Sequence, residues 1–134
     1  MRQPRDRVIA LSAITAILVA TSWAVALAVS YDDTCNASGD ACLWKNGPFV
    51  VPLAATGVSD HTYTNDDWPN TTATLNDSAS SLRNKFDVKD VVWFKDADYA
   101  GASICVDHED AVSTLGPNLN DELSSHAVSV GTTC

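Results

Sequence analysis

Residues 75–81 read Leu-Asn-Asp-Ser-Ala-Ser-Ser, and residues 119–125 read Leu-Asn-Asp-Glu-Leu-Ser-Ser. The two stretches are identical at five of seven positions and lie 44 residues apart. A repeat of this period predicts that the chain is built from two similar supersecondary units. Residues 76–81 are called hexad one, and residues 120–125 are called hexad two.

The residues around the second copy are typical of β-strands. Residues 91–94 (Val-Val-Trp-Phe) and 102–106 (Ala-Ser-Ile-Cys-Val) flank the polar turn at 95–98, and residues 127–130 predict a last strand. The segment 80–86 allows one short helical turn at most, and no stretch after residue 30 keeps a helical apolar period for three turns. The sequence therefore predicts an all-β sandwich of about eight short strands.

The first unit has the same order, with apolar residues at 42–44 and 49–51 on either side of a turn at 45–48. Together with the hexads, these hairpins resemble the βγ-crystallin family, whose domain has two Greek-key motifs that each carry the pattern N/D-N/D-x-x-S/T-S. Both hexads match that pattern at every fixed position. The resemblance implies an all-β fold in which two Greek-key motifs pack as a βγ-crystallin-like sandwich.

The family also marks the first hairpin of each motif with an aromatic residue followed by a glycine. Phe94 and Gly101 match this feature, whereas Val51 stands in the glycine position of the first hairpin. The resemblance places motif one at about residues 41–88 and motif two at about 90–134.

The N-terminal segment, residues 1–30, differs from the rest of the chain. Three arginines precede residues 8–29, which carry no charge. This pattern predicts an export signal that is cleaved after one of three small residues (Ala26, or preferably Ala28 or Ser30). Because the apolar stretch is long enough to span a bilayer, an uncleaved anchor is the alternative. In both cases residues 31–134 are expected outside the cytoplasm, as a secreted domain.

The charge of the chain excludes one class of partner. The whole chain has 8 Lys and Arg against 17 Asp and Glu, a net charge of −9, and residues 31–134 keep 5 basic and 16 acidic residues, a net charge of −11. Nucleic-acid binding needs clustered Lys and Arg against the phosphates, so we expect no nucleic-acid partner. Contact with a membrane is expected only if the N-terminal segment is uncleaved, and the exported part is expected to be a monomer.

All four cysteines lie in the exported part, where an even count predicts two disulfides. Three connectivities are possible. Cys35 and Cys42 bracket a turn-like stretch, so a local bridge between them is favoured, which leaves Cys105 to pair with Cys134. That second bridge would join a strand of motif two to the end of the chain.

The hexads carry the chemistry of a metal site. Calcium takes about six to eight oxygen ligands and accepts carbonyl, carboxylate and hydroxyl oxygens together, and each hexad offers all three kinds. The βγ-crystallin resemblance implies up to two calcium ions. Asn, Asp and Ser also cap turns without any metal, so a purely structural role for the hexads is the alternative.

Carried over by position, the resemblance implies two ligand groups. The first combines the side chain of Asp77, the carbonyl of Ser78 and the hydroxyl of Ser80 with backbone near Lys95 and Asp96. The second combines the side chain of Asp121, the carbonyl of Glu122 and the hydroxyl of Ser124 with backbone near Lys45 and Asn46. The Ser80 group is expected to bind calcium more tightly, because its assigned hairpin is the intact and acidic one.

Within the βγ-crystallin fold, the chain also resembles small exported bacterial proteins grouped as peptidase inhibitors. The Cys35–Cys42 pair, the strand that follows it, and hexad one with its Leu82-Arg83-Asn84 tail carry this resemblance. It implies a secreted protease as partner and a non-enzymatic binding role, with residues 36–41 or 59–69 entering the protease cleft. The alternative is a structural or toxin-like calcium module of the cell envelope with no protease target.

No sequence motif of a catalytic nucleophile or phosphate-binding loop is present, and the three histidines are far apart in the sequence, so no enzymatic activity is expected. Trp44 and Trp93 lie in predicted strands and are expected in the core. Trp68 precedes Pro69 and is the tryptophan expected to be exposed.

Overall fold

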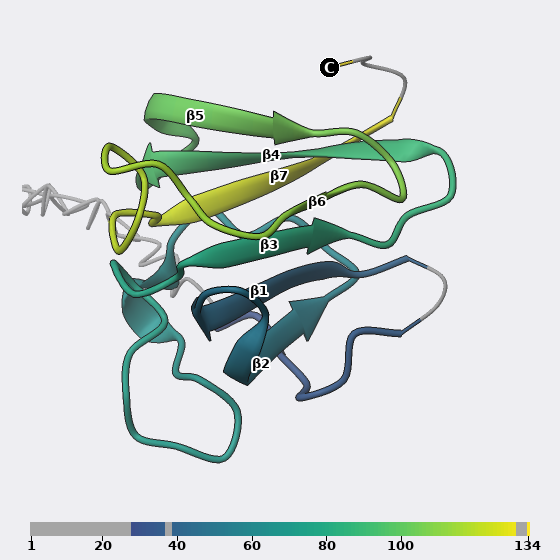
Figure 1. Cartoon of the computed structure of the whole chain (residues 1–134). Coiled ribbons are helices and arrows are strands. Elements are labelled where there is room, and N and C mark those ends of the chain that lie inside the picture. The colour runs from purple at the N-terminus through teal and green to yellow at the C-terminus, as the bar shows by residue number, and fades with distance from the viewer. Residues whose placement is uncertain (1–27, 37–38, 131–133) are drawn as a thin grey trace, which may run out of the picture.

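The computed structural model describes residues 28–36, 39–130 and 134, and its strands form two antiparallel sheets that pack face to face (Figure 1). One sheet has the order β2-β1-β3-β6, and the other has the order β5-β4-β7. The predicted all-β sandwich of two Greek-key motifs is confirmed. The described residues contain seven strands: β1 (Ala41–Asn46), β2 (Val50–Thr56), β3 (Ser81–Asn84), β4 (Lys89–Asp96), β5 (Ala100–Val106), β6 (Ala111–Val112) and β7 (Ser125–Val130).

Each motif passes one segment to the sheet of the other motif. Strand β6, from the second motif, pairs with β3 of the first, with Val112 opposite Leu82. In the opposite direction, Asp60 pairs with His126 of β7 through two backbone hydrogen bonds of 2.9 and 2.8 Å. This exchange interlocks the motifs and brings the two hexads together between the sheets.

Residues 81–84 form strand β3, not the helical turn that the sequence allowed at 80–86. The strand lies between β1 and β6, so its backbone groups find partners on both sides, and Leu82 on it is fully buried. A helical turn there would leave the backbone groups of β1 on the side away from β2 without partners. Among the described residues, the one helical element is the short 3-10 helix η1 (Tyr63–Asn65).

The main core lies between the sheets and contains Trp93, as expected. Trp93 is fully buried there. Trp44 is buried too, at 9% exposed, but it lies in a separate, smaller cluster with Cys42 and Ala55. The prediction for Trp68 is wrong, because its ring is fully buried and its Nε1 donates a 2.9 Å hydrogen bond to Ser78 Oγ. The loop that follows Trp68 is closed at its base by the bridge between Asp67 and Thr74, which holds the ring against the core.

Both predicted disulfides are present. Cys35–Cys42 joins the N-terminal arm to β1, and Cys105–Cys134 joins β5 to the end of the chain. Of the predicted export signal, residues 1–27 lie outside the described residues. Within the part of the chain that the structure describes, no helix has the length and apolar character needed to cross a membrane.

Candidate metal centre

Each hexad lies against the hairpin of its own motif. In motif two, the backbone N–H of Ser124 donates to the carbonyl of Phe94 at 3.0 Å. In motif one, the N–H of Ser80 donates to the carbonyl of Trp44 at 2.8 Å. The fifth residue of each hexad is therefore fixed beside the strand that enters the hairpin.

The sixth residue of each hexad closes the hairpin turn. Ser125 Oγ donates to the carbonyl of Asp96 at 2.7 Å and accepts from the N–H of Tyr99 at 3.2 Å. Ser81 Oγ makes the same two bonds in the first hairpin, with the carbonyl of Asn46 at 3.2 Å and the N–H of Phe49 at 3.0 Å. One hydroxyl thus satisfies two backbone groups of a turn that the strand ladder leaves unpaired.

The acidic side chains cross between the hexads. Ser124 Oγ of hexad two donates to Asp77 Oδ1 of hexad one at 3.1 Å, and Ser80 Oγ donates to Asp121 Oδ1 at 3.3 Å. The backbones cross in the same way, because Asp77 N donates to the Leu123 carbonyl and Asp121 N to that of Ala79, both at 3.0 Å. Each aspartate thus faces the serine of the other hexad.

The first residue of each hexad orients the aspartate that follows it. Asn76 Nδ2 donates to Asp77 Oδ2 at 2.6 Å, and Asn120 Nδ2 donates to Asp121 Oδ2 at 2.9 Å. Both aspartates have left-handed backbones, with φ of 52° and 55°, a conformation that Asp tolerates better than most residues. Asn76 Oδ1 is buried and has no hydrogen-bond donor, so hexad one holds a spare acceptor oxygen.

The two ligand groups that the resemblance implied therefore combine the wrong residues. Ser80 lies with Asp121 and the hairpin that contains Lys45, and this group is called the Ser80 site. Ser124 lies with Asp77 and the hairpin that contains Lys95 and Asp96, and this group is called the Ser124 site. Position along the chain could not reveal the crossing, because it depends on how the two motifs pair.

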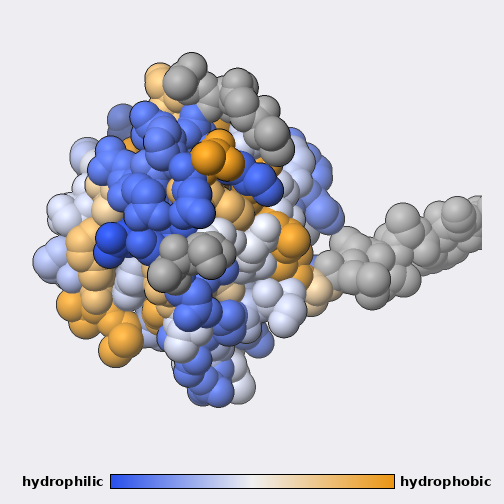
Figure 2. All heavy atoms as spheres, turned by 90° about the vertical axis from the view of Figure 1, so that its right-hand side faces the viewer, coloured by the Kyte–Doolittle hydropathy of each residue, from blue (hydrophilic) through white to orange (hydrophobic). Residues whose placement is uncertain are grey.

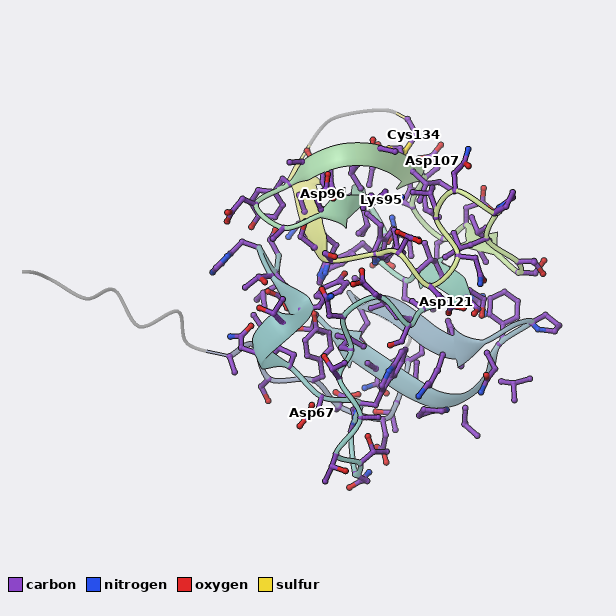
Figure 3. The ribbon with its side chains drawn as sticks, turned by 90° about the vertical axis from the view of Figure 1, so that its left-hand side faces the viewer. Asp67, Lys95, Asp96, Asp107, Asp121 and Cys134 are labelled. Carbon is purple, nitrogen blue, oxygen red and sulfur yellow. A yellow bond between two sulfur atoms is a disulfide. The ribbon has the colours of Figure 1, made fainter. Side chains whose placement is uncertain are left out.

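The two sites differ in charge. Lys95, in the hairpin of the Ser124 site, is paired with Glu122 at 3.0 Å, so its charge is compensated. Asp96 and Asp98 add carboxylates to that hairpin, and Lys95, Asp96 and Asp121 can be followed in Figure 3. The Ser80 site has Lys45 on its hairpin and no acidic residue at the third position of its hexad, which is Ser78.

The oxygen spacing of both sites fits calcium. Ligands that surround calcium at about 2.3–2.6 Å in a shell of six to eight lie about 3 Å from one another. The Ser–Asp oxygen pairs are separated by 3.1 Å in the Ser124 site and 3.3 Å in the Ser80 site. The hydroxyl and the carboxylate oxygen of each pair can therefore contact one ion together.

A buried polar cluster beside hexad two was not predicted. His126, which directly follows the hexad, is fully buried, accepts from Tyr63 Oη at Nδ1 (2.7 Å) and donates from Nε2 to the carbonyl of Val58 (2.8 Å). Asp60 and Asp66 are buried nearby, and Asp60 accepts from Tyr31 Oη at 2.7 Å. The sequence carried one sign of this cluster, because different residues follow the two hexads: Leu82 follows hexad one, and His126 follows hexad two.

Burial shifts two of these groups in opposite directions. Desolvation lowers the pKa of His126 to about 4, so the ring is neutral at physiological pH. Desolvation, together with the neighbouring Asp60 carboxyl, raises the pKa of Asp66 to about 7. The described residues enclose no pocket at this cluster.

Solved structures with the same arrangement of strands identify the fold. A structure reported on the evolution of the eye lens βγ-crystallin domain fold superposes with a TM-score of 0.64 at 24% identity, covering 77% of this chain and 98% of its own. The fold is that of a βγ-crystallin domain. A βγ-crystallin from Ciona intestinalis gives a TM-score of 0.54 at 19% identity, covering 68% of this chain and all of its own.

A third βγ-crystallin-like match is spherulin 3a from Physarum polycephalum, with a TM-score of 0.58 and 23% identity over 81% of this chain and 100% of that protein. No family model matches the chain, and no curated protein matches it. At these identities the comparisons show the βγ-crystallin fold and no activity.

Proposed function

We propose that this protein is an exported, non-enzymatic βγ-crystallin module that binds up to two calcium ions. The observation that carries the proposal is the pair of crossed Ser–Asp contacts, Ser124 with Asp77 and Ser80 with Asp121. Each contact joins a hydroxyl and a carboxylate oxygen at calcium-ligand spacing, on backbones fixed by the two hairpins. Turn capping alone does not require carboxylates that reach across to the other motif.

The charge of the exported part supports a cation as ligand. Residues 31–134 have a net charge of −11, and neither Asp77 nor Asp121 forms an ion pair with a lysine or arginine among the described residues. An ion would relieve the repulsion between the acidic groups, and affinity of about 10⁻⁵ to 10⁻³ M suits an extracellular module. Two disulfides in a domain of this size also favour an oxidising, extracellular compartment.

The proposal is tested by thermal unfolding of the purified chain in calcium. A ligand that binds only the folded state must raise the melting temperature, and an excess of about 100-fold over Kd adds about 2.7 kcal/mol. We expect the rise to disappear in the double variant Asp77→Asn, Asp121→Asn. Asp87→Asn, which makes the same chemical change at an exposed residue away from the hexads, is the matched control and should keep the full rise.

An unchanged melting temperature of the parent chain in about 10 mM calcium would overturn the proposal. So would a double variant that responds to calcium as strongly as Asp87→Asn. Magnesium in place of calcium should give a smaller rise, because magnesium demands a tighter octahedral shell.

Peptidase inhibition stays a prediction, and the structure argues against one of the two loops that were expected to enter a protease cleft. Residues 59–69 do not form a free loop, since Asp60, Tyr63, Asp66 and Trp68 among them are buried. The exposed residues of that segment, Ser59, Thr64, Asn65 and Asp67, lie between these buried side chains. A continuous exposed stretch, residues 70–72, begins just beyond it. Residual activity of secreted proteases after mixing with the chain tests this role directly.

A further inference from the structure

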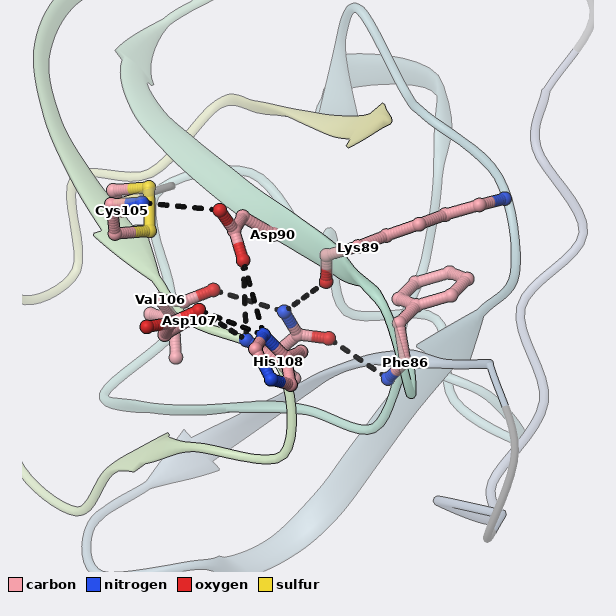
Figure 4. Close-up of polar contacts among 9 residues, drawn as sticks. Phe86, Lys89, Asp90, Cys105, Val106, Asp107 and His108 are labelled. Atoms are coloured by element: carbon pink, nitrogen blue, oxygen red, sulfur yellow. Dashed lines mark hydrogen bonds and ion pairs between the residues drawn. A yellow bond between two sulfur atoms is a disulfide. The ribbon is translucent and has the colours of Figure 1, made fainter. Parts of the chain in front are cut away.

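A second group of side chains that can bind a metal lies in the β5-β4-β7 sheet, at the end away from the hexads. Asp90 is the second residue of β4, and Asp107 and His108 directly follow β5. Figure 4 shows the three side chains converging beside the Cys105–Cys134 disulfide. Their ligand atoms all lie within 4.8 Å of one another.

The three groups are held together by the backbone as well as by their side chains. His108 Nδ1 lies 2.9 Å from Asp107 Oδ1 and 3.7 Å from Asp90 Oδ1. The N–H of His108 contacts the same two oxygens, at 3.0 and 3.3 Å. The other oxygen of Asp90 accepts from the N–H of Cys134 at 3.1 Å. One oxygen from each carboxylate is thus directed at one imidazole nitrogen.

Among the described residues, His108 is the one basic side chain that contacts Asp90 and Asp107, and a single imidazole cannot balance two carboxylates. The Asp90 side chain is 4% exposed, and no lysine or arginine of the described residues forms an ion pair with Asp90 or Asp107. A carboxylate this deeply buried is normally paired with a cation or bound to a metal. His108 and Asp107 are each about half exposed, so the group is open to an ion from solution. Figure 2 views this end of the molecule and shows hydrophilic side chains gathered over its upper part.

We propose that Asp90, Asp107 and His108 bind a divalent transition-metal ion of the zinc class. One imidazole nitrogen with two carboxylate oxygens suits zinc, whereas calcium prefers oxygen ligands alone. A tetrahedral zinc with bonds of about 2.0–2.2 Å places its ligand atoms about 3.4 Å apart. The observed spacings of 2.9 and 3.7 Å from the imidazole nitrogen lie on either side of that value.

The fourth position of the ion would be open to water, since the described residues add no further donor. The sulfur atoms of Cys105 and Cys134 lie near Asp90 but are joined in the disulfide, so they offer no thiolate. The site is separate from the proposed calcium sites, because the six steps of extended strand from Asp90 to Asp96 span about 20 Å. A metal here would join the start of β4 to the turn after β5 and, through Asp90, to the end of the chain.

The chain contains a matched control for this site. His61 Nδ1 lies 3.4 Å from Asp98 Oδ1, and both side chains are exposed, at 45% and 84%. This pair has an exposed histidine beside an aspartate but lacks the second, buried carboxylate. If the site depends on all three ligands, His61 should contribute little to binding of zinc.

The test is zinc binding by the purified chain with both disulfides intact, measured by competition with a chromogenic zinc chelator in about 10 mM calcium. We expect His108→Ala to weaken zinc binding at least about tenfold, since even loss of a group that only orients a zinc ligand costs that much. Asp107→Asn, at a half-exposed position, should weaken it by a comparable factor. His61→Ala should bind zinc as the parent does.

Two results would overturn the proposal. One is zinc affinity in His108→Ala and Asp107→Asn that equals the affinity of the parent. The other is loss of zinc binding in His61→Ala. Because calcium is present throughout and the hexads are unchanged in these variants, neither result depends on whether the hexads bind calcium.

Discussion

The Ser80 site and the Ser124 site have equivalent hydrogen bonds between hexad and hairpin but different side chains. In both, the fifth residue of the hexad bonds to the strand that enters the hairpin, and the sixth closes the turn through its hydroxyl. The hairpin of the Ser124 site has the family's glycine, and the hairpin of the Ser80 site has Val51 instead. The serine hydroxyls therefore close both turns, whether glycine or valine stands at this position.

What differs between the two halves is electrostatics. The half with the Ser124 site has Asp96, Asp98, a compensated lysine and the buried ring of His126. The half with the Ser80 site has the free charge of Lys45 and, after its hexad, the apolar Leu82. The repeated motif thus preserves the hydrogen bonds of the scaffold, while the charge and the buried titratable group beside each site come from residues outside the hexad pattern.

The largest expected effect on stability comes from replacing His126, which follows hexad two, with leucine, the residue that follows hexad one. His126→Leu leaves Tyr63 Oη and the carbonyl of Val58 without partners, and each such loss costs about 1–3 kcal/mol. We expect unfolding free energy at pH 7 to fall by about 2–4 kcal/mol, measured by urea denaturation. Leu82→Met, a buried change of similar size at the matched position, should cost less than about 1.5 kcal/mol.

The same variant should change the response to acid. Because the pKa of His126 is lowered to about 4 in the folded state, its neutral form stabilises the fold above pH 6.5, and this stability is lost as the pH falls toward 4. The loss amounts to about 3 kcal/mol, and His126→Leu should lack it. The raised pKa of Asp66 acts in the opposite sense, adding stability as the pH falls through 7, but it is common to both chains. Parallel stability curves for parent and variant from pH 7 to 4 would contradict this assignment.

The next effect compares the serines that close the two turns. Ser125→Ala leaves the carbonyl of Asp96 and the N–H of Tyr99 unsatisfied and should cost about 2 kcal/mol of unfolding free energy. Ser81→Ala should cost about the same, because it breaks the equivalent two bonds. Ser103→Ala, on an exposed position of β5, is the control and should be nearly neutral. A loss confined to Ser125→Ala would show that the two turns are not closed alike.

The smallest expected effect on stability is at the glycine position. Gly101 has a φ of 77°, and a Cβ there would collide with the Asp96 carboxylate. Gly101→Ala should therefore cost about 1–2 kcal/mol in thermal unfolding. Val51→Ala, at the same position of the other hairpin, should change stability by less than about 0.5 kcal/mol, because that side chain is 71% exposed. Equal costs at the two positions would mean that Val51 is under the same backbone constraint as Gly101.

The fold could be predicted from sequence because its decisive residues are local. The two hexads, the apolar runs of β4 and β5, and the short spacing of Cys35 and Cys42 each report on nearby structure. The residues of the proposed calcium sites could be named for the same reason, since they belong to the hexads and hairpins. Their grouping was not, since Ser124 reaches Asp77 only through the pairing of the two motifs, and the burial of Trp68 depends on a loop closed by distant contacts.

The regrouping reverses the expected order of the two calcium sites. The acidic hairpin belongs to the Ser124 site, so this site should bind calcium more tightly than the Ser80 site, where Lys45 opposes the ion. The ranking deduced from sequence gave the Ser80 site first, because it assigned the acidic hairpin to hexad one. The difference lies entirely in which hairpin each hexad contacts.

Calorimetric titration with calcium of Ser124→Ala, Ser80→Ala and Asp77→Asn, beside the parent chain, tests the crossed arrangement most directly. The crossing predicts that Ser124→Ala and Asp77→Asn weaken the same, tighter binding phase, because their oxygens are 3.1 Å apart in one site. Ser80→Ala should leave that phase intact and weaken the other. Loss of one phase by both Asp77→Asn and Ser80→Ala, with Ser124→Ala acting on the other, would contradict the crossed arrangement.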